Sequence, residues 1–245
     1  MRQLGTGVHV FENTHKILPA NGGPVAGSGF LTGKDEIRAP STRDFSLGMT
    51  FRWGLREPNA VPTSQPGSWA YSILAQLKVE SLPTPGQYVA ECASYRCPSR
   101  DRGGPAQIPR PDAYGVYFSN GLAMAKTDYC GNDQVLQNLP HVSRVRRITS
   151  GLSHTVLFGE KAFDPLVQLP TSWYWDEPIY VGGSKGTARS GTEIFGDGVG
   201  IAFKENWGSP HPQLCGFVFA DGHAVNLSQQ IDRSVLRDMM SPTSQ

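Results

Sequence analysis

Two carboxylates in the second half of the chain have the types and positions that acid–base chemistry requires. Glu160 follows an apolar run at residues 155–158, and Asp221 begins an Asp-Gly pair between two β-prone runs. Both could reach one end of a sheet, and glycoside hydrolysis uses two carboxyl groups about 5–10 Å apart. Alternatively, Glu160 caps backbone groups or pairs with a cation, and Asp221 forms an Asx turn. The sequence leaves both hypotheses open.

Three tryptophans could supply the stacking faces of a sugar-binding site. They are Trp173, Trp175 and Trp207. Large aromatic side chains also dominate hydrophobic cores, so the alternative is that all three are buried.

Two groups of residues could ligate a metal ion. Glu193, Asp197 and Asp221 offer the hard oxygens that calcium prefers, although their spacing matches no known calcium loop. His211 stands nine residues before Asp221-Gly222, and it could hydrogen-bond a loop, pair with Asp221 or ligate a metal. Calcium is therefore the one cofactor considered; otherwise we expect none.

The four cysteines give no clear signature. Cys92 and Cys97 are close in sequence, whereas Cys130 and Cys215 are solitary. A zinc site usually shows a second close Cys or His pair, and there is none here, so the spacing predicts no zinc site. Four cysteines allow three pairings, and a Cys92–Cys97 disulfide stays open.

Composition excludes several classes of protein. Lys and Arg number 22 against 21 Asp and Glu, which argues against nucleic-acid or membrane-surface binding driven by bulk charge. The longest apolar runs, about six residues, fall short of the ~20 that span a bilayer, so we expect a chain that is soluble as given. With 28 Gly, 19 Pro and 18% charged residues, the chain suits a loop-rich β or α+β domain.

Local patterns predict the elements. Leu4, Val8 and Phe11 form one helical stripe within residues 2–15. A short helix is predicted at 69–77 after the capping residue Ser68, and a last helix at 231–240 with Asp232 in its first turn. Strands are predicted near 45–53, 114–119, 155–160, 173–176 and 201–204. Asp221-Gly222 predicts a two-residue type I′ turn in a hairpin over 215–227.

The order of these elements predicts an α+β fold in which one antiparallel sheet packs on the amino-terminal helix. We expect a single domain over residues 1–245. It comprises the end of an amino-terminal helix at 1–17, a loop-rich region at 18–112 and a β-rich part at 113–245.

Several stretches together resemble one family, in its order and over essentially the whole chain. They are Arg2-Gln3-Leu4-Gly5 with Phe11-Glu12-Asn13, Gly67-Ser68-Trp69-Ala70-Tyr71-Ser72, Cys97-Pro98-Ser99-Arg100, Thr127-Asp128-Tyr129-Cys130-Gly131-Asn132, residues 148–161 with Gly159-Glu160-Lys161, and Gly208-Ser209-Pro210-His211 through Asp221-Gly222. The family is that of the planctomycete prepilin-like proteins with a carboxyl-terminal H-x9-D-G domain, a prepilin-type processing-associated domain of unknown function.

The resemblance implies a pilin-like fold and a non-enzymatic, exported structural subunit, periplasmic or at the cell surface in the full-length family form. Its partners would be other pilin-like subunits or an export machinery. The family's cleavage site and hydrophobic helix are missing here, and His154, Cys130 and His223 depart from its pattern. The competing hypothesis is a carbohydrate-active hydrolase or glycan-binding module built on the same domain, with Glu160 and Asp221 as its acid–base pair.

Overall fold

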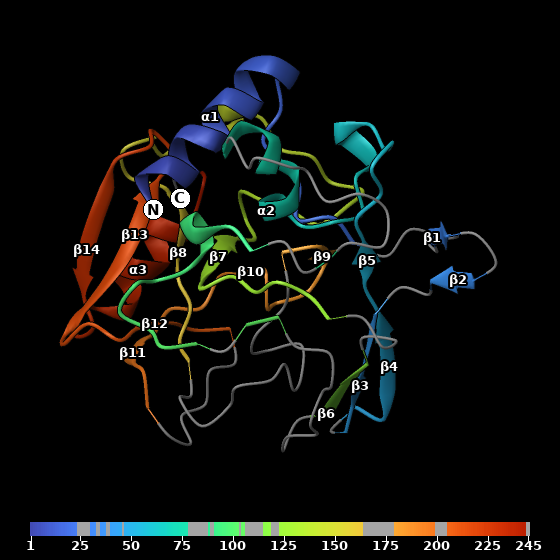
Figure 1. Cartoon of the computed structure of the whole chain (residues 1–245). Helices are drawn as coiled ribbons and strands as arrows, with labels where there is room; N and C mark the ends of the chain where they lie inside the picture. Colours follow the sequence, from blue (N-terminus) through green and yellow to red (C-terminus); the bar gives the residue numbers. More distant parts are fainter. Residues whose placement is uncertain are drawn as a thin grey trace.

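The computed structural model describes most of the chain (Figure 1). The described residues are 1–23, 30–32, 35–37, 40–45, 47–77, 88, 91–102, 104–105, 115–118, 123–163, 179–198 and 205–243; for 30–32 and 35–37 only the backbone is described. The strands predicted at 173–176 and 201–204 lie outside these residues.

A five-stranded sheet forms the centre of the fold. Its spatial order is β10 (Ala188–Arg189), β7 (Tyr129–Asn132), β8 (Val156–Glu160), β13 (Leu214–Phe219) and β14 (Ala224–Ser228). Neighbours from β7 to β14 pair antiparallel, and β10 pairs parallel with β7. The predicted strand at 155–160 and the hairpin at 215–227 are therefore confirmed, and together they form the middle of this sheet.

The prediction of one single sheet was wrong, because four smaller sheets accompany the central one. They are β1 (Phe30–Thr32) with β2 (Asp35–Ile37), β4 (Met49–Arg52) with β3 (Ser41–Asp44) and β6 (Gly115–Phe118), β5 (Gly54–Leu55) with β9 (Val181–Gly182), and β11 (Ile194–Gly196) with β12 (Trp207–Ser209). None of these strands exceeds four residues. Frequent glycine and proline residues interrupt the β-prone runs of the sequence. The strands therefore stay short, and each pairs with a neighbouring segment. The strand predicted near 45–53 corresponds to β4, and that near 114–119 to β6.

The amino-terminal helix α1 (Arg2–His15) is confirmed and crosses the top of the sheet in Figure 1. Leu4 and Val8 are fully buried, and Phe11 is nearly so. Gly5 brings the helix close to the sheet, because a Cβ there would lie 3.2 Å from Cγ1 of Val218 on β13. The helix ends at Lys16, whose left-handed backbone (φ 59°) lets its N–H bond the Glu12 carbonyl.

The helix predicted at 69–77 is divided in two. Ser68 caps α2 (Trp69–Ser72) as expected, its Oγ accepting from the Tyr71 N–H. Ile73 then leaves the helical conformation, and a 3₁₀ turn, η2 (Leu74–Leu77), follows. Further 3₁₀ turns are η1 (Pro62–Ser64), η3 (Ala93–Tyr95) and η4 (Val145–Arg147).

The last helix, α3 (Arg233–Met240), begins two residues later than predicted. Asp232 is its N-cap rather than a first-turn residue, and its carboxylate accepts from the Ser234 N–H at 2.7 Å. Leu236 and Met240 are buried against the sheet face that carries Phe217, whereas Val218 belongs to the cluster under α1. Side-chain alternation along β13 thus gives each helix its own face of the sheet.

The observed architecture is α+β, as predicted, with helices on both faces of a largely antiparallel sheet. Among the described residues, no helix combines the length and apolar character needed to cross a bilayer.

The hairpin turn differs from the predicted type I′ turn. Gly222 has a positive φ of 91°, but Asp221 is not among the positive-φ residues. The Gly222 N–H bonds the Phe219 carbonyl, and the Phe219 N–H bonds the carbonyl of His223. This pattern is a three-residue turn closed by a left-handed glycine, which needs only one positive φ.

Candidate functional site

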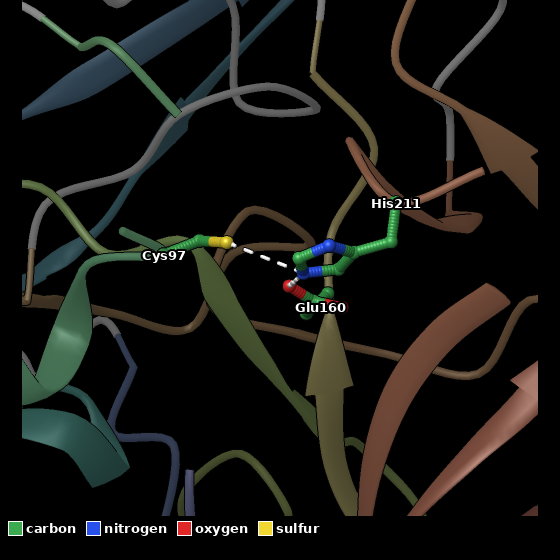
Figure 2. Close-up of side chains that lie close together, drawn as sticks. All are labelled: Cys97, Glu160 and His211. Atoms are coloured by element: carbon green, nitrogen blue, oxygen red, sulfur yellow. Dashed lines mark hydrogen bonds and ion pairs between the residues drawn. The ribbon is translucent and has the colours of Figure 1, made fainter. Parts of the chain in front are cut away.

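Three side chains from distant parts of the chain converge near the end of β8 (Figure 2). Nε2 of His211 lies 3.7 Å from Sγ of Cys97 and 3.6 Å from Oε1 of Glu160. One ligand atom from each of the three lies within 4.8 Å of the other two, and this is the only such group of His, Cys, Asp or Glu in the described ranges. We call it the Cys–Glu–His cluster.

Glu160 is the buried member of the cluster. It ends β8 and is 2% exposed. Its Oε2 accepts a hydrogen bond of 2.7 Å from the backbone N–H of Gly216 on β13. A Cβ at Gly216 would lie 2.7 Å from Sδ of Met1 and 3.1 Å from Oε2 of Glu160, so a larger residue would push both side chains aside. The glycine therefore lets the backbone reach the carboxylate and fixes its orientation.

Cys97 follows η3 and is held by a buried aspartate. Its backbone N–H donates to Oδ2 of Asp128 at 2.6 Å, and Asp128 is fully buried just before β7. The same carboxylate accepts a hydrogen bond from the Arg102 guanidinium, with which it forms an ion pair. Loop 91–102 is thus anchored to the start of the central sheet, which places the Cys97 thiol at the end of β8.

His211 lies in the turn between β12 and β13. Its N–H donates to Oγ of Ser209 at 3.1 Å, and its carbonyl accepts from the Gln229 side chain at 3.2 Å. The imidazole side chain is 44% exposed, so the cluster faces solvent on the His211 side.

A buried ion pair supports the neighbouring backbone. Arg100 donates to both carboxylate oxygens of Asp197 at 2.7 and 2.8 Å, and also to the carbonyls of Lys161 and Gly208. Charge-assisted bidentate pairs of this kind are strong and geometrically specific. Arg100 therefore links the segments that carry all three members of the cluster.

Burial governs the protonation of the nearby thiols. Desolvation raises the pKa of Cys97 above its usual value, and the Glu160 charge acts in the same direction, against a backbone hydrogen bond from Ser99. Desolvation likewise raises the pKa of Cys215 well above its usual value. Both thiols are therefore protonated at neutral pH, which does not favour a nucleophilic cysteine.

Glu160 and Asp221 are not brought together. Glu160 contacts Gly216 near the start of β13, whereas Asp221 follows the end of that strand and pairs with Nδ1 of His223. About 10 Å of strand separates Gly216 from Phe219, and the turn lies beyond it. The His223 hydrogen bonds outweigh partial burial and lower the pKa of Asp221.

The three calcium candidates each have a separate partner. Glu193 pairs with Arg233, Asp197 with Arg100, and Asp221 with His223. All three carboxylates are described, and they do not form a common ligand set.

The expected stacking surface is not formed by Trp207, which is fully buried against Phe217. Its indole N–H bonds the Gly191 carbonyl, so it is a satisfied core residue. Trp173 and Trp175 lie outside the described residues.

All four cysteines are free thiols, so the Cys92–Cys97 disulfide is not formed. The η3 turn separates the two residues, and the Cys97 sulfur contacts His211 instead.

One groove lies apart from the cluster, beside the end of α1. It has a volume of about 190 Å³ and is lined by residues that include Phe11, His15, Pro58 and Tyr71. None of its ten lining residues is acidic, so it does not provide the carboxylate pair of a glycosidase.

Sequence spacing did not reveal the Cys–Glu–His cluster, since its members are separated by 63 and 51 residues (97 to 160, and 160 to 211). The only available signal was that each member lies in a stretch quoted for the family resemblance. Those stretches meet in space at this one site (Figure 2).

Comparison with known proteins places the chain in a family. The model of the family described as "Protein of unknown function (DUF1559)" matches residues 1–234, nearly the whole chain. The chain belongs to the DUF1559 family. Neither the search of curated proteins nor the search of solved structures gave a match. This membership agrees, at the level of the family, with the resemblance described from the sequence. The family description assigns no activity.

Proposed function

We propose that this DUF1559 protein is the globular domain of a pilin-like structural subunit, exported and assembled with other pilin-like subunits rather than acting as an enzyme. The observation that carries the proposal is the packing of α1 against the central sheet. A subunit that assembles through its amino-terminal helix needs that helix fixed rigidly to its globular part.

The contacts of α1 meet this need. Gly5 allows close approach to Val218 on β13 and to Gly222 in the hairpin turn, while Leu4 and Val8 are fully buried. The helix is therefore fixed to the carboxyl-terminal hairpin by close packing rather than held by a few surface contacts.

The outer face of α1 remains available for subunit contacts. Val10 is 45% exposed, and Gln3, Thr6 and Asn13 are also exposed on the helix. An apolar side chain among small polar ones suits helix–helix packing between copies of the chain. A glycosidase is not proposed, because Glu160 on β8 contacts Gly216 near the start of β13, whereas Asp221 lies beyond the other end of that strand.

The proposal is tested by photocrosslinking in the full-length protein in its native host. A photoreactive residue at Val10 is expected to give ladders of crosslinked subunits. The matched control is Val235, a valine that is 43% exposed on α3, the helix that packs on the other face of the central sheet from α1. Equal ladders from both positions, or none from Val10, would contradict assembly through α1.

A further inference from the structure

We propose that Cys97, Glu160 and His211 bind one zinc ion, through Sγ, Oε1 and Nε2 respectively. This inference is independent of the structural role proposed above, since it rests on the geometry of the cluster alone. It also reverses the expectation from spacing that the chain has no zinc site.

The two separations from Nε2 of His211 match edges of a zinc coordination tetrahedron, and the third, between the Cys97 sulfur and a Glu160 carboxylate oxygen, lies within 4.8 Å. With Zn–S of about 2.3 Å and Zn–N and Zn–O of about 2.1 Å, tetrahedral angles place sulfur and nitrogen about 3.6 Å apart and nitrogen and oxygen about 3.4 Å apart. The observed separations from Nε2 are 3.7 Å to Sγ and 3.6 Å to Oε1. The nitrogen–oxygen separation is too long for a direct hydrogen bond, which has a length of about 2.7–3.2 Å.

The donor set also suits zinc. A thiolate, an imidazole and a carboxylate are the three ligand types that zinc sites use, whereas calcium and magnesium prefer oxygen alone. On binding, the Cys97 thiol releases its proton to solvent and its sulfur bonds to the metal. Thiolate and carboxylate then carry two negative charges, which neutralise the charge of Zn²⁺ in a largely buried place.

Neighbouring groups hold the ligands in place before any metal arrives. The Gly216 N–H occupies Oε2 of Glu160 and leaves Oε1 for the cluster, and Asp128 holds the backbone of Cys97. Ser209 and Gln229 hold the backbone of His211. Outer partners of this kind commonly orient metal ligands and strengthen binding.

Three protein ligands leave a fourth zinc position for water. The exposed side of His211 provides entry from solvent, whereas Glu160 closes the inner side. The ion would join loop 91–102, the end of β8 and the turn before β13, three segments that no disulfide connects among the described residues.

The test is metal titration of the purified full chain after treatment with a chelator. Titration with Zn²⁺ in a calorimeter is expected to show one ion per chain. Co²⁺ is expected to give a near-ultraviolet thiolate-to-metal absorption band, which reports a cysteine ligand directly. Cys97→Ser and His211→Ala should each weaken zinc binding about tenfold or more, and Cys97→Ser should abolish the cobalt band.

Two matched variants control for other cysteines and histidines. Cys92→Ser changes the free cysteine nearest in sequence, and His223→Ala changes a histidine whose side chain is 43% exposed, like that of His211. Both are expected to bind zinc as the unmodified chain does. The His211→Ala variant loses only a half-exposed side chain, so this variant should fold even if Glu160→Gln, which changes a buried carboxylate, does not. Absence of zinc binding, or unchanged binding in Cys97→Ser and His211→Ala, would overturn the proposal.

Discussion

At the scale of single residues, the Asp-Gly pair sets the backbone conformation of the hairpin turn and forms a local ion pair. Gly222 has a positive φ, and a Cβ there would lie 3.1 Å from Nε2 of His9 on α1. Asp221 bonds both the backbone and the ring of His223. The pair therefore shapes the hairpin turn and the contact between that turn and α1.

Replacing Gly222 with valine should destabilise the protein by about 1–3 kcal/mol, because a β-branched residue is strained in the left-handed region. Gly222→Asn should cost less, since asparagine tolerates that region better while adding a Cβ at the same place. Chemical denaturation of both variants measures the difference. Equal unfolding of Gly222→Val and the unmodified chain would refute the role of the positive φ.

Low pH should remove the contribution of Asp221 to the stability of the folded protein. Its pKa is lowered in the folded state by His223, so its stabilising effect is complete above the unfolded value of about 3.9 and is lost as pH falls through the lower folded value. Asp221→Asn should therefore melt below the unmodified chain at pH 6, and the two melting temperatures should converge below about pH 4. A gap that widens in acid would contradict this sign.

At the scale of elements, α1 packs against the rest of the protein through one apolar face. Leu4, Val8 and Phe11 point into the core, and Val10 points to solvent. This buried face makes packing the main source of stability for the helix.

Two valines on α1 test this directly. Val8→Ala should cost about 1.5–3 kcal/mol, because Val8 is fully buried. Val10→Ala should change the free energy of unfolding by about 0.5 kcal/mol or less, since Val10 is 45% exposed and alanine favours helix. Denaturant titration of both variants gives the comparison, and similar losses would mean that α1 is not anchored by this face.

At the scale of the whole molecule, Arg100 connects segments that are far apart in sequence. Its side chain reaches Asp197, the Lys161 carbonyl and the Gly208 carbonyl from a loop that also carries Cys97. It is 8% exposed, and its charge is balanced within the same network by Asp197 and Asp128.

Arg100→Ala should destabilise the chain by about 3–5 kcal/mol, because it leaves buried carboxylates without their partner. The control is Arg233→Ala, which breaks the exposed pair with Glu193 and should cost about 1 kcal/mol or less. Thermal or denaturant unfolding distinguishes the two. Comparable small losses would show that the Arg100 network does not hold these segments together.

Elements whose signals are local could be predicted from the amino-acid sequence. The apolar stripe of Leu4, Val8 and Phe11 predicted α1, Ser68 predicted the start of α2, and the apolar runs around Asp221-Gly222 predicted the hairpin of β13 and β14. These signals succeed because helix periodicity, capping and turn glycines depend on residues within a few positions of one another. The family relationship was also readable, because it rests on short stretches in a fixed order.

Which distant residues meet became visible only in the folded structure. Glu160 was singled out for a partnership with Asp221, yet the antiparallel pairing of β8 with β13 places it beside Gly216 and opposite His211 and Cys97. Trp207 is in the core because β12 packs beneath β13. Strand order and register arise from contacts between residues far apart in sequence, and no local pattern encodes them, so the Cys–Glu–His cluster could emerge only once the chain was folded.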